Sequence, residues 1–447
     1  MMRVSRGSRV ATLAACVTLL LSAAACGTEQ PEEAGDESQQ VRLYGNDGNM
    51  LNTFPNELKD RADLVNGMKG TTPMTPLPED FKTRLRAVNP DLRDFLYAAE
   101  AYDAVMISAL ATQLAGTTDP AAIAKQVIGV TNEGQRCDDA VNCLKLARAG
   151  QDIEYRGVSL TRAGFTDAGE PATASYATVH FDDEKLNDAK TEFVGAGDDS
   201  QASTTAPPKG RKPRGDTGAP LTLGGLLPRT GPASGAYPPQ ATGAALAVRE
   251  INAAGGVLDE PVVWIDGDDG TNPDVARATL AAHVKKNVQV IIGAGTSGVS
   301  KAILPDVVAA GLVMFSPANT DASLTTIEDK GLYFRTAPPD SLQGQALADV
   351  IMRDGPRKVA LIARKDSYGE GLQGYVRTEL ERAGLGGDKV KLLTYDPPAD
   401  SDAPPVDFTA GAREIKEFGA DAVLLIGYAE SAAVILALHE AGVRIQQ

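Results

Sequence analysis

Few residues in this 447-residue chain have the types and spacing that catalysis requires. The three histidines (His180, His283 and His439) are scattered, and we expect each to lie on the surface instead of binding a metal or acting as a base. The run GAGTSG (293–298) lacks a full dinucleotide fingerprint, and no GxSxG, HExxH or Walker A motif occurs. The sequence therefore predicts no catalytic residue, no metal and no cofactor, and a Rossmann-type enzyme is the weaker alternative.

The first residues have the pattern of an export signal. Arg3, Arg6 and Arg9 form a basic start, and an apolar run over 10–25 follows that is short for a membrane span. The segment LSAAACG (21–27) is similar to a bacterial lipobox, in which the cysteine, Cys26, is lipidated after cleavage. We therefore expect a signal peptide over 1–25 and a lipid anchor on Cys26. The alternative is a plain secretory signal cleaved nearby, which leaves Cys26 removed or as a free thiol.

Cleavage of the signal peptide would leave two cysteines besides Cys26, namely Cys137 and Cys143, which are separated by five residues. If Cys26 carries a lipid, these two are left to pair with each other. Export places them in an oxidising compartment, so a disulfide that closes a small loop is favoured, with a stabilisation of roughly 2 kcal/mol.

The charge balance bears on the class of partner. The chain has 43 Lys+Arg against 59 Asp+Glu, a formal net charge of -16. Such a chain repels nucleic-acid phosphate, so we expect no nucleic-acid partner. Its length suits two α/β lobes better than one small core.

Two stretches are polar and lack hydrophobic periodicity. Residues 26–40 are acidic and are predicted to be a disordered tether. Residues 195–219 are rich in Gly, Ser, Thr and Pro, carry a basic patch at 209–214, and are predicted to be a disordered linker. The basic patch is interpreted as a solvated charge run, with contact to anionic lipid as the alternative.

From residue 221 onward, strand and helix patterns alternate, which is typical of a doubly wound parallel sheet. Strands are predicted at 221–227, 262–266, 288–293, 312–316, 358–363, 390–395 and 422–427. Helices are predicted between them, including 241–254, stopped by Gly255 and Gly256, and a helix from Asn272 and Pro273 to about Lys286.

The two ends of the sequence complement each other. A helix predicted over about 430–441 should lead into another parallel strand, but only residues 442–447 follow it. Residues 41–45 read as a strand with no element before it to pair with. Written end to end, 442–447 followed by 41–45 gives a continuous passage from helix to strand.

Motifs over more than 200 residues resemble those of the type I periplasmic binding proteins, the class that includes leucine/isoleucine/valine receptors of ABC importers. In family order they are LTLGGLLPRTGPASGAYPPQATGAALAVREINAAGGV (221–257), IIGAGTSGVSKAILP (291–305), MFSPANTDASLT (314–325), YFRTAPPDSLQG (333–344), DSYGEGL (366–372) and LLIGYAE (424–430). Residues 41–192 resemble the last third of the family, with YGNDGN (44–49), GMKGTTP (67–73), YAAEAYDAV (97–105), CDDAVNC (137–143) and YRGVSLTRAGFTDAGEPATASY (155–176).

The resemblance implies a circularly permuted order of two doubly wound α/β lobes joined by a hinge. Lobe 1 would comprise 76–168 and 220–339, lobe 2 would comprise 41–75 and 340–447, and 169–194 would form the hinge and part of lobe 2. A gene-model or assembly error is an alternative to permutation. A fusion of two incomplete receptors is disfavoured because no segment is duplicated.

The resemblance also implies a ligand site between the lobes. Ser297, Ala318 and Thr320 match positions that hold the ligand carboxylate and ammonium. Tyr368 and Tyr428 match aromatics that cover the ligand from the other lobe, and Asp47 matches an acidic residue that pairs with the ammonium. The ordinary alternatives are a helix cap for Ser297, a turn hydroxyl for Thr320, an Asp-Gly turn for Asp47 and simple packing for the tyrosines.

The function implied is capture of a small amino-acid-like ligand by hinge closure, outside the cytoplasm, and delivery to an ABC permease in the membrane. We expect a monomer tethered to the membrane by the lipid on Cys26. The alternative within the same fold is a sensor that reports its ligand to a membrane partner without transport.

Overall fold

The computed structural model describes residues 40–210, 219–398 and 403–447. The expected signal peptide, Cys26 and the tether up to residue 39 lie outside the described residues. In the part that is described, no helix is both long enough and apolar enough to cross a membrane. The elements below belong to the unit that runs from Gln39 to Gln447.

One sheet has five strands, all parallel. Its order is β12 (Tyr333–Arg335), β11 (Val313–Ser316), β10 (Val290–Gly293), β8 (Thr222–Leu226) and β9 (Val263–Ile265). Consecutive side chains of β10 face opposite sides, since Val290 and Ile292 pack in one core and Ile291 in another. Both faces of the sheet are therefore covered, as is usual for parallel sheets.

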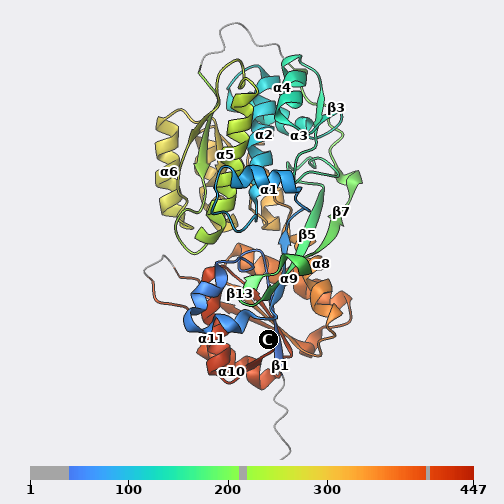
Figure 1. Cartoon of the computed structure of the whole chain (residues 1–447), viewed down its shortest axis with the longest axis vertical. Helices are drawn as coiled ribbons and strands as arrows, with labels where there is room; N and C mark the ends of the chain where they lie inside the picture. The colour runs from blue at the N-terminus through green and yellow to red at the C-terminus, as the bar shows by residue number, and fades with distance from the viewer. Residues whose placement is uncertain (1–39, 211–218, 399–402) are drawn as a thin grey trace, which may run out of the picture. The chain divides into compact units, whose positions relative to one another are not determined.

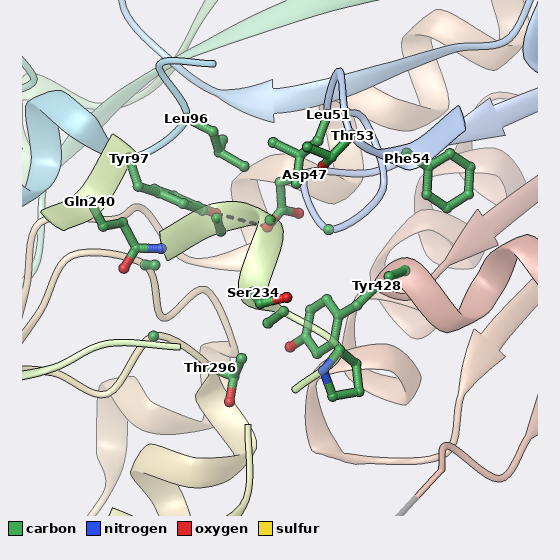
Figure 2. A pocket seen from close by; sticks show the side chains of 18 of the residues that line it. Asp47, Leu51, Thr53, Phe54, Leu96, Tyr97, Ser234, Gln240, Thr296 and Tyr428 are labelled. Carbon is green, nitrogen blue, oxygen red and sulfur yellow. Dashed lines mark hydrogen bonds between the residues drawn. The ribbon is translucent and has the colours of Figure 1, made fainter. Parts of the chain in front are cut away.

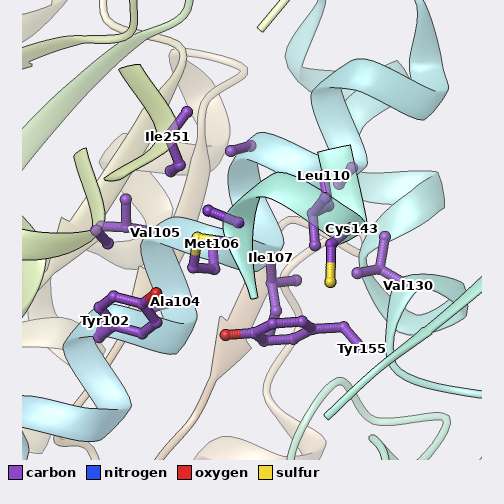
Figure 3. Packing of buried hydrophobic residues seen from close by; sticks show 14 of the residues in the cluster. Tyr102, Ala104, Val105, Met106, Ile107, Leu110, Val130, Cys143, Tyr155 and Ile251 are labelled. Carbon is purple, nitrogen blue, oxygen red and sulfur yellow. The ribbon is translucent and has the colours of Figure 1, made fainter. Parts of the chain in front are cut away.

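Helices from two distant parts of the sequence cover this sheet. α6 (Pro273–Lys285) and α7 (Ser297–Ala309) contribute to the core that contains Ile291. α5 (Tyr237–Ala253) and α2 (Ala98–Ala115) contribute to the core on the other face. Every residue of α2 is buried, and Figure 3 shows side chains of this helix within that core. A segment near the start of the chain thus completes the lobe that later residues build.

Smaller elements surround α2. They are α1 (Glu79–Arg86), α3 (Pro120–Val130), α4 (Ala140–Arg148) and the two-stranded parallel sheet of β3 (Gln135–Cys137) and β4 (Ile153–Tyr155). A disulfide joins Cys137 at the end of β3 to Cys143 in α4, which confirms the predicted pairing.

The other sheet has nine strands and is mixed. Its main order is β14 (Val390–Tyr395), β13 (Val359–Arg364), β15 (Ala422–Ile426), β1 (Gln40–Gly45), β2 (Lys69–Pro73), β5 (Thr173–Asp182) and β6 (Lys185–Leu186). The first five strands are parallel, but β5 runs antiparallel to β2 and to β7 (Glu192–Gly197). The predicted α/β fold is confirmed, although this sheet is not parallel throughout.

Helices also pack on both faces of the nine-stranded sheet. α11 (Ala432–Glu440) and α10 (Thr409–Phe418) share a core with Ala360 and Ile362 of β13, whereas α8 (Asp340–Arg353) and α9 (Ser367–Arg382) share one with Leu361. Figure 1 shows α10 and α11 in red beside β1 in blue. The irregular 3₁₀ segment η1 (Phe54–Val65) contacts α11.

The first and last strands of the described residues lie side by side. β16 (Arg444–Ile445) pairs in parallel with Gln40 and Val41 of β1, and the Gln446 amide donates to the Val41 carbonyl over 2.9 Å. These segments are therefore neighbours, but they run alongside each other and not end to end as the joined sequence indicated. The permuted order itself stays a prediction.

The predicted disordered linker is wrong for residues 195–210. β7 continues to Gly197 on β5 through backbone hydrogen bonds, and Gln126 donates from its amide to the carbonyl of Pro208 over 3.0 Å. Backbone pairing of this kind needs no apolar side chains, so the polar composition did not reveal it. Residues 211–218 lie outside the described part of the chain.

The prediction for His283 is also wrong. This side chain is buried on α6, and its Nε2 lies 2.8 Å from the carbonyl oxygen of Gly225 in β8. Its hydrogen bond to β8 satisfies this buried ring nitrogen and links α6 to the five-stranded sheet.

Candidate functional site

The six side chains predicted to bind a ligand line a single cavity of about 370 Å³. They are Asp47, Ser297, Ala318, Thr320, Tyr368 and Tyr428. Each follows the carboxyl end of a strand, namely β1, β10, β11, β13 or β15. Ligands in open α/β sheets bind at this edge. Figure 2 shows side chains of both sheets' loops around the cavity.

The five-stranded lobe contributes the first turn of α7. Thr296 and Ser297 both line the cavity, and Thr296 precedes the helix without capping it through its side chain. The first N–H groups of a helix lack intrahelical partners and lie at the positive end of its dipole. This end of the cavity is therefore suited to an anionic group such as a carboxylate.

The Ser297 hydroxyl links two of the site loops. Its oxygen accepts hydrogen bonds from the backbone N–H of Thr320 (3.1 Å) and of Asp321 (3.2 Å). The backbone N–H of Thr320 is consequently engaged within the protein. Ser297 can still donate its own hydroxyl proton.

Asn319 holds these loops from behind. Its amide nitrogen donates to the Ala294 carbonyl over 3.0 Å, and its oxygen accepts from the Tyr333 hydroxyl over 3.0 Å. The Ser316 hydroxyl donates to the same Ala294 carbonyl over 2.7 Å. The segment before Ser297 is thus fixed by two donors from the neighbouring strand and loop.

The nine-stranded lobe contributes Asp47, whose carboxylate accepts three hydrogen bonds. The Tyr97 hydroxyl lies 2.8 Å from Oδ2, while the Tyr368 hydroxyl and the Gln343 amide lie 2.9 and 3.0 Å from Oδ1. Asp47 is 5% exposed, and burial raises the pKa of its carboxyl while these hydrogen bonds oppose the rise. A cationic ligand group is the natural complement of such a carboxylate.

Gly48 lets the Asp47 loop approach the Tyr428 loop. A Cβ atom at Gly48 would lie 2.3 Å from the carbonyl oxygen of Gly427 and 2.7 Å from the Tyr428 ring. Only glycine permits this spacing, so the Asp-Gly pair serves a close contact between two site loops.

Tyr368 and Tyr428 form an aromatic wall. Their rings are stacked, with centroids 5.6 Å apart and planes 10° from parallel. The Arg364 guanidinium lies 4.0 Å from the centroid of the Tyr428 ring and pairs with Glu430 over 2.6 Å. A cation on this ring fixes the wall beside the cavity.

Asp340 is a second buried carboxyl close to the site. It starts α8, is fully buried, and its pKa is raised well above the ordinary value by burial and then by the charge of Asp47. Because Asp47 has three hydrogen-bond donors, we assign the negative charge to Asp47 and a neutral carboxyl to Asp340. Across the described ranges, no three His, Cys, Asp or Glu side chains gather as a metal site.

Sequence reasoning missed several residues that line the cavity. Tyr97 is the first residue of the motif YAAEAYDAV (97–105), but nothing in that motif relates it to Asp47. Gln240 and Phe54 also line the cavity, and no motif marks either of them as a site residue. Their positions depend on how distant segments pack, which no local spacing records.

This chain is similar in sequence to known periplasmic binding proteins. Residues 220–447 match the family model described as periplasmic binding protein. The Leu/Ile/Val-binding protein homolog 3 of Brucella melitensis is 30% identical over 230 residues, which cover 51% of this chain and 60% of that protein. The Leu/Ile/Val-binding protein BraC3 of Rhizobium johnstonii is 31% identical over 214 residues, covering 47% of this chain and 55% of the relative.

A solved structure shows a similar partial match. The branched-chain amino acid transporter substrate binding protein LivJ from Streptococcus pneumoniae, in complex with isoleucine, is 24% identical with a TM-score of 0.39. The match covers 47% of this chain and 57% of that one. The chain thus spans little more than half the length of the relatives it matches. Since the family model covers just over half of the 447 residues, the chain belongs to the periplasmic binding protein family.

Proposed function

We propose that this protein is an extracytoplasmic solute-binding protein that captures an amino-acid-like ligand between its two lobes. The observation that carries the proposal is that one cavity has a positive end and a negative end. The free N-terminus of α7 lies on one lobe and the Asp47 carboxylate on the other, and both border the same space. A zwitterionic amino acid has the complementary pair of charges.

The ligand's carboxylate would lie at the start of α7, with the hydroxyls of Ser297 and Thr320 as further donors. Its ammonium would pair with Asp47, and the stacked rings of Tyr368 and Tyr428 would cover it. Ammonium groups are also attracted to the faces of aromatic rings. Each lobe thus binds one end of the ligand, so the ligand favours a state in which the lobes are closed.

We also propose that the protein delivers its ligand to an ABC permease. The relatives of this chain include proteins named as Leu/Ile/Val-binding proteins and a transporter substrate-binding protein. We propose that a permease recognises the closed form of a monomer anchored to the membrane through lipid on Cys26. Cys26→Ser should then release the protein to the soluble fraction, and retention of the variant in membranes would reject the anchor.

Matched ligands test the binding proposal. The protein is titrated in a calorimeter with L-leucine, L-leucinamide and 4-methylpentanoate. All three compounds have the leucine side chain, but L-leucinamide lacks the carboxylate and 4-methylpentanoate lacks the ammonium. If L-leucine binds, each truncated compound should bind at least about 100-fold more weakly, because a buried charged partner is left unpaired. All twenty L-amino acids and their D-enantiomers form the wider panel. Binding of no amino acid, or equal binding of leucine and its truncated forms, would refute the proposal.

A further inference from the structure

Gln240 is an unexplained polar group in the wall of the cavity. It lines the cavity, its side chain is fully buried, and neither its amide nitrogen nor its amide oxygen has a hydrogen-bond partner among the described residues. Figure 2 shows its carboxamide directed into the space ringed by the labelled side chains. A buried carboxamide with both atoms unpaired is rare in folded proteins.

Three other buried glutamines each have at least one paired amide atom, and Gln113 is paired through its oxygen, which accepts from the Leu258 N–H over 2.9 Å. The Gln343 nitrogen donates to Asp47 over 3.0 Å, and the Gln373 nitrogen donates to the carbonyls of Leu361 and Leu393 over 2.8 and 2.9 Å. Gln240 differs because its side chain lines the cavity and neither of its polar atoms has a hydrogen-bond partner among the described residues. Its hydrogen bonds are therefore open to a group that enters the cavity.

The element that carries Gln240 is firmly held. Gln240 lies in the first turn of α5, after Pro238 and Pro239, whose rings fix the backbone of that turn. One turn on, a Cβ atom at Gly243 would lie 2.1 Å from the carbonyl oxygen of Ala98, so α5 is packed tightly against the start of α2. Gln240 is thus presented by a helix whose position is set by the core.

The charged ends of the ligand already have partners in the proposed function, on which this inference rests. Gln240 therefore faces a third group of the ligand. A carboxamide offers a donor and an acceptor side by side, and its full complement is another carboxamide. An aliphatic side chain satisfies neither atom, and a carboxylate satisfies only the donor. The apolar side chains of Leu51, Phe54 and Leu96 also line the cavity and suit the methylene groups that precede such an amide.

We propose that Gln240 is a specificity-determining residue and that the preferred ligands are amino acids with a carboxamide side chain. The Gln240 nitrogen donates to the ligand's amide oxygen, and the ligand's amide nitrogen donates to the Gln240 oxygen. Sites built to pair a polar group discriminate strongly against analogues that lack it, because the buried partner is left unpaired.

The first test compares ligands of nearly equal shape. L-glutamine is measured against L-methionine, and L-asparagine against L-leucine, by calorimetric titration of the full protein. At least one amide should bind about 10- to 100-fold more tightly than its apolar counterpart. Leucine or methionine binding as tightly as both amides would overturn the inference and leave the proposed function standing. Binding of no amino acid would refute the proposed function, and this inference with it.

The second test changes Gln240 itself. Gln240→Met keeps the length of the side chain, and it should weaken amide binding about 10- to 100-fold while methionine and leucine bind as before or more tightly. Gln151→Met, at an exposed position, is the matched control and should change neither. The melting temperature of unliganded Gln240→Met should equal or exceed that of the wild type, since an unpaired buried amide has been removed. Equal losses for amide and apolar ligands, or a lowered melting temperature, would show a structural role and overturn the inference.

Discussion

The Tyr97 hydroxyl donates a hydrogen bond of 2.8 Å to Oδ2 of Asp47. Tyr97 immediately precedes α2, which packs under the five-stranded sheet, whereas Asp47 follows β1 of the nine-stranded sheet. The bond therefore joins the two lobes directly at the cavity. A ligand ammonium that binds Asp47 enters a site that both lobes already help to form.

Asp47→Asn should abolish most of the binding of an amino acid while the fold remains. The amide keeps the shape of the side chain but leaves the ligand's ammonium without a buried counter-charge, at a cost of about 3–5 kcal/mol. The expected loss of affinity is thus more than about 100-fold in a calorimetric titration. Asp91→Asn, at an exposed site, should bind like the wild type. Unchanged affinity in Asp47→Asn would remove this residue from the site.

Tyr97→Phe should shift the pH dependence of binding. Binding an ammonium requires the ionised form of Asp47, so affinity rises as pH increases through the pKa of this carboxyl, which burial holds above its ordinary value. The Tyr97 hydrogen bond lowers that pKa, and its removal should move the rise in affinity to higher pH. Dissociation constants measured from about pH 4 to 9 check this. Identical pH profiles for the two proteins would contradict the assigned hydrogen bond.

Glu100→Gln should flatten the pH dependence of stability. Glu100 is buried in the first turn of α2, and burial raises its pKa from 4.5 to about 8. Between these values the folded state binds one more proton than the unfolded state at this site, so stability falls as pH rises, by about 1.4 kcal/mol per pH unit. Urea unfolding across this pH window should show a smaller decline for Glu100→Gln than for the wild type or for the exposed control Glu440→Gln. Parallel declines in all three proteins would count against a buried neutral Glu100.

Strands could be predicted from the sequence where a run of apolar residues ends at a polar turn. Strands predicted at 288–293 and 358–363 appear as β10 (Val290–Gly293) and β13 (Val359–Arg364). The cavity residues recovered from the sequence are those that follow such strands. Gln240 and Tyr97 carry no such signal because their places in the cavity wall depend on how α5 and α2 pack together.

Other features depend on backbone or long-range hydrogen bonds that composition does not record. His283 gains its partner from Gly225, 58 residues earlier, and a lone histidine in a helix gives no local signal of this. Residues 195–197 continue a strand despite their polar and glycine-rich surroundings, because β5 supplies the backbone partners.

A reordered chain tests whether the segment order is a circular permutation. The N-terminal segment supplies β1 and β2 to one sheet and α2 to the core of the other lobe. A protein that runs from 219 to 447 and then from 40 to 210 keeps all these contacts. Because β16 lies alongside β1, the new junction needs a flexible linker of about five Gly/Ser residues to turn back. The reordered protein should fold and bind the same amino acid with the same affinity as the natural order. A soluble but non-binding product would contradict the permutation.

A crystal structure of the protein with its tightest-binding L-amino acid tests the central proposal most directly. The account predicts the ligand's carboxylate at the first N–H groups of α7 and its ammonium within about 3.2 Å of the Asp47 carboxylate, with Tyr428 against it. A ligand bound outside this cavity, or bound inside it with its ammonium toward α7 and its carboxylate toward Asp47, would contradict the account.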